Sequence, residues 1–291
     1  MSGFWSKAGS VALCFCYAVI ALLFFAGLQL ASGLMLAYLG VDLYENDGAF
    51  TVTYCVIIIT FGFIVSKLLT LFGSKNIIET RKQQWEPLCS VLMAFGLLGL
   101  VTLFMVLVGY LAEAGVGNTQ EELERYNESV DRYAGVEVSV IPIADHILGL
   151  IGSAFLVPLA EEITFRGFIM GFFKKTVKPV WAILLSSLIF GVVHGTIIQI
   201  IYAFVCGVVL ACVYQMTGSI WNSYLMHMVF NLFGGSLRTF FESGLISFPD
   251  GFLDNFDYVS YMAEIMFIGP AVGAAMILYK MYRKRIADES A

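Results

Sequence analysis

The chain carries little charge: Asp, Glu, Lys and Arg make up only 13% of its 291 residues, against about 25% in a typical soluble domain. Hydrophobic residues account for 59% of the sequence and aromatic residues for 15%. The apolar residues gather in runs of about 20, the length that crosses a bilayer as a helix. This composition excludes an ordinary soluble domain and indicates a polytopic membrane protein, with the lipid bilayer as its surroundings.

Basic runs interleaved with aromatic residues are also absent from the sequence. Such runs are the electrostatic footprint of nucleic-acid binding. The formal net charge of -6 comes from the segments between the apolar runs. We therefore do not expect a nucleic-acid partner.

Closely paired cysteines are missing as well. None of the six cysteines forms a CxxC pattern, and all lie in or beside apolar runs: Cys14, Cys16, Cys55, Cys89, Cys206 and Cys212. Disulfides and a cysteine-ligated metal are therefore not expected. The first apolar run is too long for the core of a signal peptide and has no evident small-residue cleavage site. We interpret it as a retained first transmembrane span.

Eight apolar segments are candidates for transmembrane helices. They cover residues 10–39, 51–73, 88–112, 140–162 (or on to 173), 180–198, 200–216, 219–241 and 258–282. The polar stretch 113–139 is acidic and predicts an exposed loop with a short helix around 119–133. The sequence thus predicts an all-α polytopic membrane protein with about eight transmembrane helices.

The segments between these spans alternate in charge. The basic ones carry Lys75, Arg81 and Lys82, then Lys174, Lys175 and Lys178, and finally Arg283, Lys284 and Arg285. The acidic ones follow the first, third and seventh spans. Because basic loops stay on the cytoplasmic side, we expect a multi-pass protein of the cell membrane with both termini cytoplasmic.

Two adjacent glutamates, Glu161 and Glu162, lie at the end of the fourth apolar segment. A charge at membrane depth costs about 2.5–3.5 kcal/mol on insertion scales, so it marks a functional position by default. On a helix Glu162 and Arg166 are i,i+4 neighbours and can pair, whereas Glu161 points about 100° away. We predict that Glu162 pairs with Arg166 and that Glu161 is left as a general base. A salt bridge at a helix end, without catalysis, would produce the same pattern.

Two of the three histidines also lie in apolar segments. His194 follows Phe190 by one helical turn, beside Gly191 and Gly195, which would allow another helix to approach closely. His227 and Asn231 are i,i+4 neighbours, and both can donate hydrogen bonds to an oxyanion. Each feature alone also fits a buried, hydrogen-bonded core residue.

Together, the acid pair and the two histidines suggest one shared site. We predict that Glu161, His194, His227 and Asn231 converge on one water-accessible cavity, since burying them unpaired is costly. Glu161, His194 and His227 could hold a zinc ion or polarise a water molecule. The residues alone leave open whether a metal takes part.

The three motifs, Glu161-Glu162-x-x-x-Arg166, Phe190-x-x-x-His194 and His227-x-x-x-Asn231, occur in this order on successive apolar segments. In this they resemble the CAAX protease and bacteriocin-processing (CPBP, or Abi) family of intramembrane metalloproteases. The resemblance covers roughly residues 140–240. It divides the chain into N-terminal spans with an acidic loop (1–139), a core with the motifs (140–241), and a last span with a basic tail (242–291).

The resemblance implies a helical bundle around an intramembrane cavity and hydrolysis of a peptide bond in a membrane-associated peptide or protein. Glu161 would activate water with help from His194, and His227 with Asn231 would stabilise the oxyanion. Glu162 and Arg166 would brace the site. The family name implies a metal, but a glutamate-dependent mechanism without one fits the same residues.

Two other functions remain open at this stage. The chain could be a non-catalytic membrane partner, such as a bacteriocin self-immunity protein or a scaffold for a sensor kinase. It could also be a transporter that uses the buried Glu and His residues for protons or metal ions. Transporters usually show interrupted repeats, which this sequence lacks, and the complete set of motif residues favours the peptidase.

Overall fold

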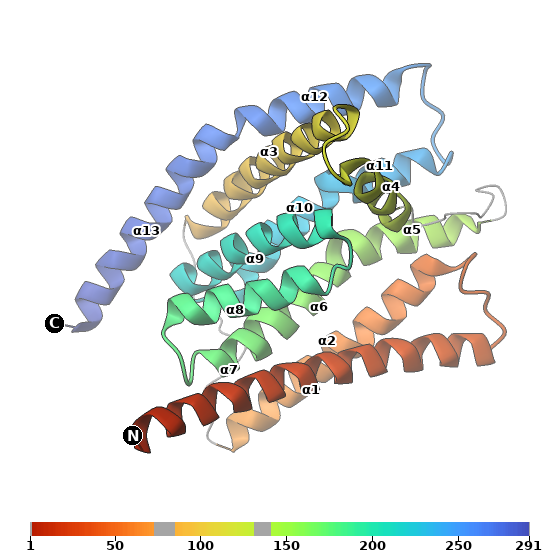
Figure 1. The fold of residues 1–291 in the computed structure, drawn as a ribbon. Coiled ribbons are helices and arrows are strands. Elements are labelled where there is room, and N and C mark those ends of the chain that lie inside the picture. Colours follow the sequence, from red (N-terminus) through yellow and green to blue (C-terminus); the bar gives the residue numbers. More distant parts are fainter. Residues whose placement is uncertain (1, 73–84, 131–140, 291) are drawn as a thin grey trace.

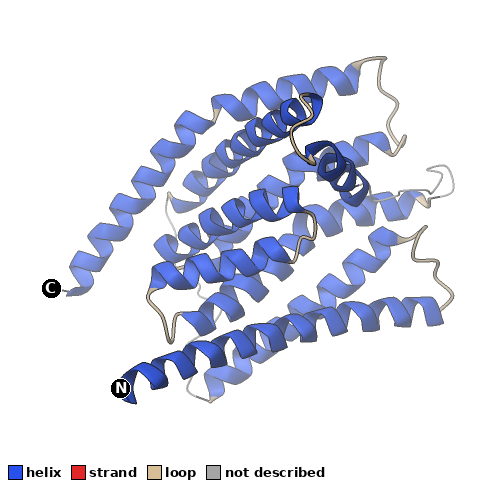
Figure 2. Cartoon of the chain, in the orientation of Figure 1, coloured by secondary structure: helices blue, strands red, loops and turns tan. Residues whose placement is uncertain are grey.

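The computed structural model describes residues 2–72, 85–130 and 141–290. Across these ranges the chain forms helices joined by loops and turns and contains no strand (Figure 2). The predicted all-α class is therefore confirmed. The basic residues Lys75, Arg81 and Lys82 lie outside the described residues.

The first half of the chain forms three long helices and a short one. These are α1 (Ser2–Tyr38), α2 (Asp47–Leu71), α3 (Glu86–Glu113) and α4 (Thr119–Val130). The helix α4 is the short polar helix predicted around 119–133, and it carries no buried residue. It lies against α9 at one end of the bundle (Figure 1).

The second half begins with one continuous rod, Ile143–Phe173. The rod consists of α5 (Ile143–Ile151), the π-helical segment η2 (Gly152–Leu156), α6 (Val157–Glu162), the π-helical segment η3 (Ile163–Met170) and α7 (Gly171–Phe173). It is followed by α8 (Pro179–Val192), α9 (Ile197–Thr217), α10 (Ile220–Asn231), the π-helical segment η4 (Leu232–Ser236), α11 (Leu237–Glu242), α12 (Phe252–Met266) and α13 (Ile268–Ser290).

Each of the eight predicted spans corresponds to a helix or a series of helices, although not all have the length of a membrane span. Five helices among the described residues are long and apolar enough to cross a membrane, and α12 with α13 adds a sixth if this pair, bent by 42°, is one span. The expected spans 180–198 and 219–241 contain the shorter α8 and the interrupted rod α10–η4–α11. By length and composition the structure thus supports five or six crossings, fewer than the eight expected.

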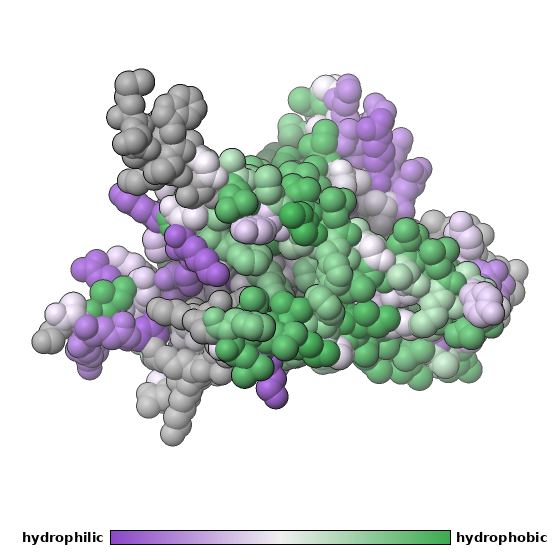
Figure 3. Space-filling view, turned by 90° about the horizontal axis from the view of Figure 1, so that it is seen from below, coloured by the Kyte–Doolittle hydropathy of each residue, from purple (hydrophilic) through white to green (hydrophobic). Residues whose placement is uncertain are grey.

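The outer surface of the bundle is apolar. The best apolar window of α1 is only 11% buried, and side chains such as Leu23 and Leu30 are about two-thirds exposed. Soluble monomers rarely expose so much contiguous apolar surface. In Figure 3 the hydrophobic side chains form a broad central belt, and hydrophilic ones gather toward the ends. This surface fits a lipid environment.

The two ends of the bundle differ in charge. Both termini and the α7–α8 turn, with Lys174, Lys175 and Lys178, lie at one end (Figure 1). The α1–α2 loop, α4 and the α11–α12 loop lie at the opposite end and carry mostly acidic residues. We refer to these as the basic end and the acidic end.

Local sequence explains where several helices begin and end. Pro179 stands at the first position of α8, where a missing N–H costs nothing. Thr196 caps α9 by accepting a hydrogen bond from the Gln199 amide, and Gly218 ends α9 in the left-handed conformation. The guanidinium of Arg285 in α13 donates to the carbonyls of Met216 and Thr217, which satisfies groups that the end of α9 leaves free.

Glycines set two of the close contacts around the site. A Cβ on Gly191 would lie 2.8 Å from the Ile200 carbonyl oxygen, so α8 and α9 approach as closely as predicted. The same prediction for Gly195 was wrong. No heavy atom lies within 4 Å of a Cβ at Gly195, and its φ of +94° shows that it makes the turn after α8 instead.

The start of α2 is fixed by a buried carboxylate of α5. The side chain of Asp145 accepts hydrogen bonds from the backbone amides of Gly48 and Ala49, at 2.8 and 2.7 Å. These amides belong to the first turn of α2, which has no helical partners for them. A Cβ on Gly48 would collide with the Asp145 carbonyl oxygen. The pair therefore attaches the α1–α2 hairpin to the rod that carries Glu161.

Replacing Asp145 by Ala should destabilise the protein by about 2–3 kcal/mol, since it removes two charge-assisted bonds at a buried helix start. Thermal unfolding of the purified chain in detergent measures the change. The matched control is Asp42→Ala, which removes an exposed carboxylate that accepts from the Tyr44 amide. Equal melting temperatures for the two variants would contradict the predicted role of Asp145.

Candidate active site

Glu162 is the centre of the site and is completely buried. Its Oε1 atom lies 3.1 Å from Nη1 of Arg166 and 3.0 Å from Nδ1 of His227. Arg166 is 1% exposed and also donates to the Gly207 carbonyl of α9 at 3.2 Å. The predicted Glu162–Arg166 pair is thus confirmed, and the structure adds His227 as a second partner of the same oxygen.

Glu161 faces the other side of the same imidazole. Its Oε2 atom lies 3.5 Å from Nε2 of His227, and its side chain is 27% exposed. With Glu162 accepting from Nδ1–H, a neutral His227 would present an Nε2 lone pair to this carboxylate. A proton shared between Glu161 and His227 would remove that repulsion, because the two atoms lie within direct contact distance. The arrangement suits a site that moves a proton to and from water.

Phe190 lies between the site residues on α8, α10 and the rod. Its ring packs edge-on against both imidazoles, with centroid distances of 4.7 Å to His194 and 5.9 Å to His227. The guanidinium carbon of Arg166 lies 4.7 Å from the same ring, a favourable cation–π distance. Phe190 therefore keeps bulk water away from the buried ion pair while it holds both histidines.

His194 lies just beyond the end of α8. Its Nδ1 is 2.7 Å from the Phe190 carbonyl oxygen. Because a carbonyl oxygen can only accept, Nδ1 must carry the proton, and Nε2 of the neutral ring is left as an acceptor. The half-buried ring therefore presents a basic nitrogen next to Phe190.

Asn231 comes one helical turn after His227 on α10. Its Nδ2 atom donates to the Ser153 carbonyl oxygen at 3.1 Å. Ser153 belongs to η2, a π-helical turn that begins six residues before Pro158. Pro158 cannot donate a backbone hydrogen bond to this turn. The bond fixes the carboxamide and leaves its second N–H for another acceptor.

Glu161 lines a groove of about 480 Å³ between α1, α2, the rod and the turn after α8. Its lining is mostly apolar, and the polar side chains in it are Glu161, Gln29, Tyr54 and Thr164. Since α1 exposes most of its surface, the groove lies near the lipid-facing surface. We call it the Glu161 groove.

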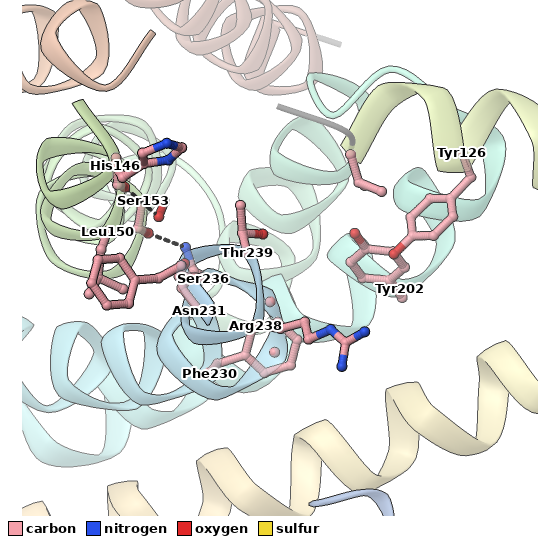
Figure 4. A pocket seen from close by; sticks show the side chains of 15 residues that line it. Tyr126, His146, Leu150, Ser153, Tyr202, Phe230, Asn231, Ser236, Arg238 and Thr239 are labelled. Atoms are coloured by element: carbon pink, nitrogen blue, oxygen red, sulfur yellow. Dashed lines mark hydrogen bonds between the residues drawn. The ribbon is translucent and has the colours of Figure 1, made fainter. Parts of the chain in front are cut away.

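Asn231 lines a different cavity of about 350 Å³ (Figure 4). This cavity lies toward the acidic end, between the rod, α4, α9 and the α10–α11 rod. The prediction that the four residues face one cavity is therefore modified. Glu161 and His227 meet, while Glu161 and Asn231 line separate cavities.

The predicted zinc ligands do not form a cluster. No group of three His, Cys, Asp or Glu side chains within the described ranges is arranged to hold a metal ion. The Nδ1 of His194 is occupied by the Phe190 carbonyl, and both nitrogens of His227 face glutamates. The triad Glu161, His194 and His227 therefore does not fit zinc in this geometry.

Sequence patterns found the principal residues but missed one contact between them and one supporting residue. The second partner of Glu162, His227, lies 65 positions away along the chain, and no local spacing reports such a contact. Gly207 was not singled out, because a glycine in an apolar helix has many uses. Its carbonyl binds Arg166, and a Cβ there would press against Phe190 and Ser187, both at 3.1 Å.

Comparison with known proteins agrees with the predicted family. Residues 143–233 match the family model described as type II CAAX prenyl endopeptidase Rce1-like. This stretch contains all six predicted site residues, from Glu161 to Asn231. The resemblance to the CAAX protease and bacteriocin-processing family is thus confirmed for this region. No solved structure matches the chain.

Two curated bacterial relatives match the chain over part of its length. The "Putative membrane peptidase YdiL" of Bacillus subtilis is 34% identical over 86 residues, which is 30% of this chain and 35% of the relative. The UPF0177 protein YxdF of Lactococcus lactis is 37% identical over 102 residues, which is 33% of this chain and 53% of the relative. The chain thus covers about a third to a half of these relatives.

Glu162→Gln should destabilise the protein by about 3–5 kcal/mol, because it leaves Arg166 charged and buried without its counter-ion. Glu161→Gln is the matched control, since its partly exposed carboxylate has no arginine partner within the described ranges, and it should leave stability nearly unchanged. Unfolding of both variants in detergent provides the comparison. Adding Arg166→Met to Glu162→Gln should recover part of the lost stability. If the double variant recovers none of it, or if Glu162→Gln and Glu161→Gln are equally stable, the proposed role of the Glu162–Arg166 ion pair is wrong.

Proposed function

We propose that this chain, whose residues 143–233 match the Rce1-like family, is an intramembrane endopeptidase that hydrolyses a peptide bond of a membrane-associated peptide or protein. The observation that carries the proposal is the position of His227 between two glutamates. Glu162 is neutralised by Arg166 and orients the ring, whereas Glu161 is partly exposed and faces the free nitrogen. Glu162 thus positions the His227 ring, and Glu161 remains available for proton transfer.

In the proposed mechanism, Glu161 takes a proton from water as that water attacks the substrate carbonyl carbon. The Nε2 atom of His194 helps to hold the water. The carbonyl oxygen becomes an oxyanion, which the free N–H of Asn231 stabilises by a hydrogen bond. His227, whose two nitrogens face Glu161 and Glu162, positions the catalytic carboxylate. As the C–N bond breaks, Glu161 returns the proton to the leaving amine.

The surroundings of the site support this division of roles. The Phe190 ring excludes water and lowers the local polarity, which strengthens each electrostatic interaction with the developing charge. The Glu161 groove offers an apolar path from the lipid side to the carboxylate. Both termini lie at the basic end (Figure 1), and we propose from the positive-inside rule that this end is cytoplasmic in the cell membrane.

Glu161→Gln keeps the shape of the side chain but removes the base. We expect it to reduce cleavage by at least about 10²–10⁴-fold, with unchanged abundance and membrane insertion. The measurement compares newly formed protein termini in native-host membranes that contain the wild-type or the variant chain. Glu113→Gln, at an exposed helix end, is the matched control. If membranes with the Glu161→Gln variant contain the same newly formed protein termini as wild-type membranes at equal abundance, the chain is a non-catalytic membrane partner instead.

Asn231→Ala should reduce the cleavage rate by about 10²–10³-fold, the usual effect of removing one oxyanion donor. The loss should fall on kcat rather than on KM, since the interaction forms only in the transition state. Steady-state kinetics on a substrate identified by its new terminus would measure both parameters. Asn255→Ala, on the exposed surface of α12, provides the control. A change confined to KM would assign Asn231 to substrate binding.

A further inference from the structure

The cavity beside Asn231 is bounded by two irregular helical turns from different parts of the chain, the π-helical turn η2 and the segment η4, which is kinked at Gly235. The segments η2 and η4 contact each other, and the Asn231–Ser153 hydrogen bond joins the two rods at this point. π-Helical turns are rare and occur frequently at functional sites. At membrane depth, irregular backbone is tolerated where it is buried in protein or lines a water-filled cavity. The two facing turns therefore mark this cavity as functional rather than as a packing defect.

The opposite wall of the cavity comes from α4 and α9. Tyr126 of α4 and Tyr202 of α9 pack edge-on, with ring centroids 6.2 Å apart, and in Figure 4 they face His146 and Ser153 across the cavity. Burial raises the pKa of Tyr126, so its phenol stays neutral and can donate or accept. The helix α4 thus closes the side of the cavity toward the acidic end.

The polar lining suits a peptide main chain. Hydroxyl and carboxamide groups from five elements line the space, namely those of Tyr126, Tyr202, Asn231, Ser236 and Thr239. Such groups donate and accept hydrogen bonds without a charge, as peptide N–H and C=O groups require. Asn231 lines this cavity, and His227 lies one helical turn before Asn231 on α10.

Among the described residues, the lining contains one basic Lys or Arg side chain, that of Arg238, and it does not favour anions. Arg238 forms ion pairs with Glu242 at 2.9 Å and Asp257 at 2.8 Å, so two carboxylates more than balance its charge. The facing helix α4 adds Glu121, Glu122, Glu124 and Glu128 against Arg125. A ligand segment with carboxylates would be repelled at this entrance, and a neutral or basic segment would not.

From these observations we propose that the Asn231 cavity binds a polar peptide segment that carries no carboxylate, by hydrogen bonds to its main chain. If the proposed peptidase function is right, this segment is the flank of the substrate that extends from the scissile bond toward the acidic end. The apolar flank then lies in the Glu161 groove. The identification as substrate rests on the proposed function, but binding does not require cleavage.

Thiol labelling tests the cavity independently of any cleavage. Thr239→Cys places a thiol in the lining, and Ile151→Cys places one on the exposed apolar face of the same region, where its side chain is 41% exposed. In nanodiscs, a cationic methanethiosulfonate reagent should label Thr239→Cys several-fold faster than an anionic one. The wild-type chain gives the background of the native cysteines. No labelling above background, or faster labelling by the anionic reagent, would overturn the proposal.

Protection from labelling tests the ligand class. Short Gly-Ser and Gly-Lys repeat peptides should slow the labelling of Thr239→Cys, whereas a Gly-Glu repeat peptide should not. None of these peptides should affect Ile151→Cys. The proposal fails if no peptide protects Thr239→Cys, or if the Gly-Glu peptide protects it as well as the others.

Cavity filling then connects binding to cleavage. Leu150→Trp, from α5, should fill the cavity and reduce Glu161-dependent cleavage at least tenfold, and Ser236→Trp should do the same from η4. Ile151→Trp, at the adjacent lipid-facing position, should leave cleavage unchanged. Size-exclusion profiles identify any variant that misfolds, so that the other can be used.

The outcomes separate the two proposals. Full cleavage by both filled variants would refute the binding site while leaving the peptidase intact. Absence of cleavage even in the wild-type chain, with peptide protection retained, would refute the peptidase and leave a peptide-binding membrane protein.

Discussion

The site depends on one fully buried carboxylate that serves two partners. Glu162 neutralises Arg166 through one oxygen and orients His227 through the same oxygen. A buried ion pair is weak evidence for stability, because desolvation of both charges offsets their attraction. Here the ion pair serves to orient side chains. It joins the rod, α9 and α10 at one point and fixes which nitrogen of His227 faces Glu161. Without that point the three elements would still pack, but the ring would have no preferred orientation.

Local sequence predicted this pair because both residues lie on one helix. The i,i+4 spacing survives even though residues 163–170 form a π-helical turn, which was not predicted. Neither proline nor glycine spacing reports a π turn reliably, since tertiary contacts decide where one forms. The same limit explains the missed contact between Glu162 and His227, which depends on how α10 packs against the rod.

The number of transmembrane spans is a second property that sequence patterns alone did not predict correctly. Apolar runs predicted the long helices α1, α2, α3 and α9 well, because hydrophobicity over about 20 residues is a strong signal. Residues 180–198 are as apolar as the other runs, yet the helix there ends before a glycine turn at Gly195. Residues 219–241 are more polar, since they include Asn222, His227, Asn231 and Arg238, and the helix there is interrupted at η4. Hydropathy reports how apolar a segment is, but it does not report where the helix in that segment ends. Both interruptions lie beside site residues, where irregular backbone is most useful.

The outer wall of the Glu161 groove has a consequence for how such proteins can diverge. Its lining residues Leu22, Phe25 and Tyr54 belong to α1 and α2, whereas the stretch that matches the family model begins only at residue 143. The residues of the proposed reaction centre and the outer wall of the groove are thus encoded in separate parts of the chain, joined at Asp145 and Gly48. Under the proposed function, exchange of the first hairpin between relatives would change ligand preference and leave the proposed catalytic residues unaltered.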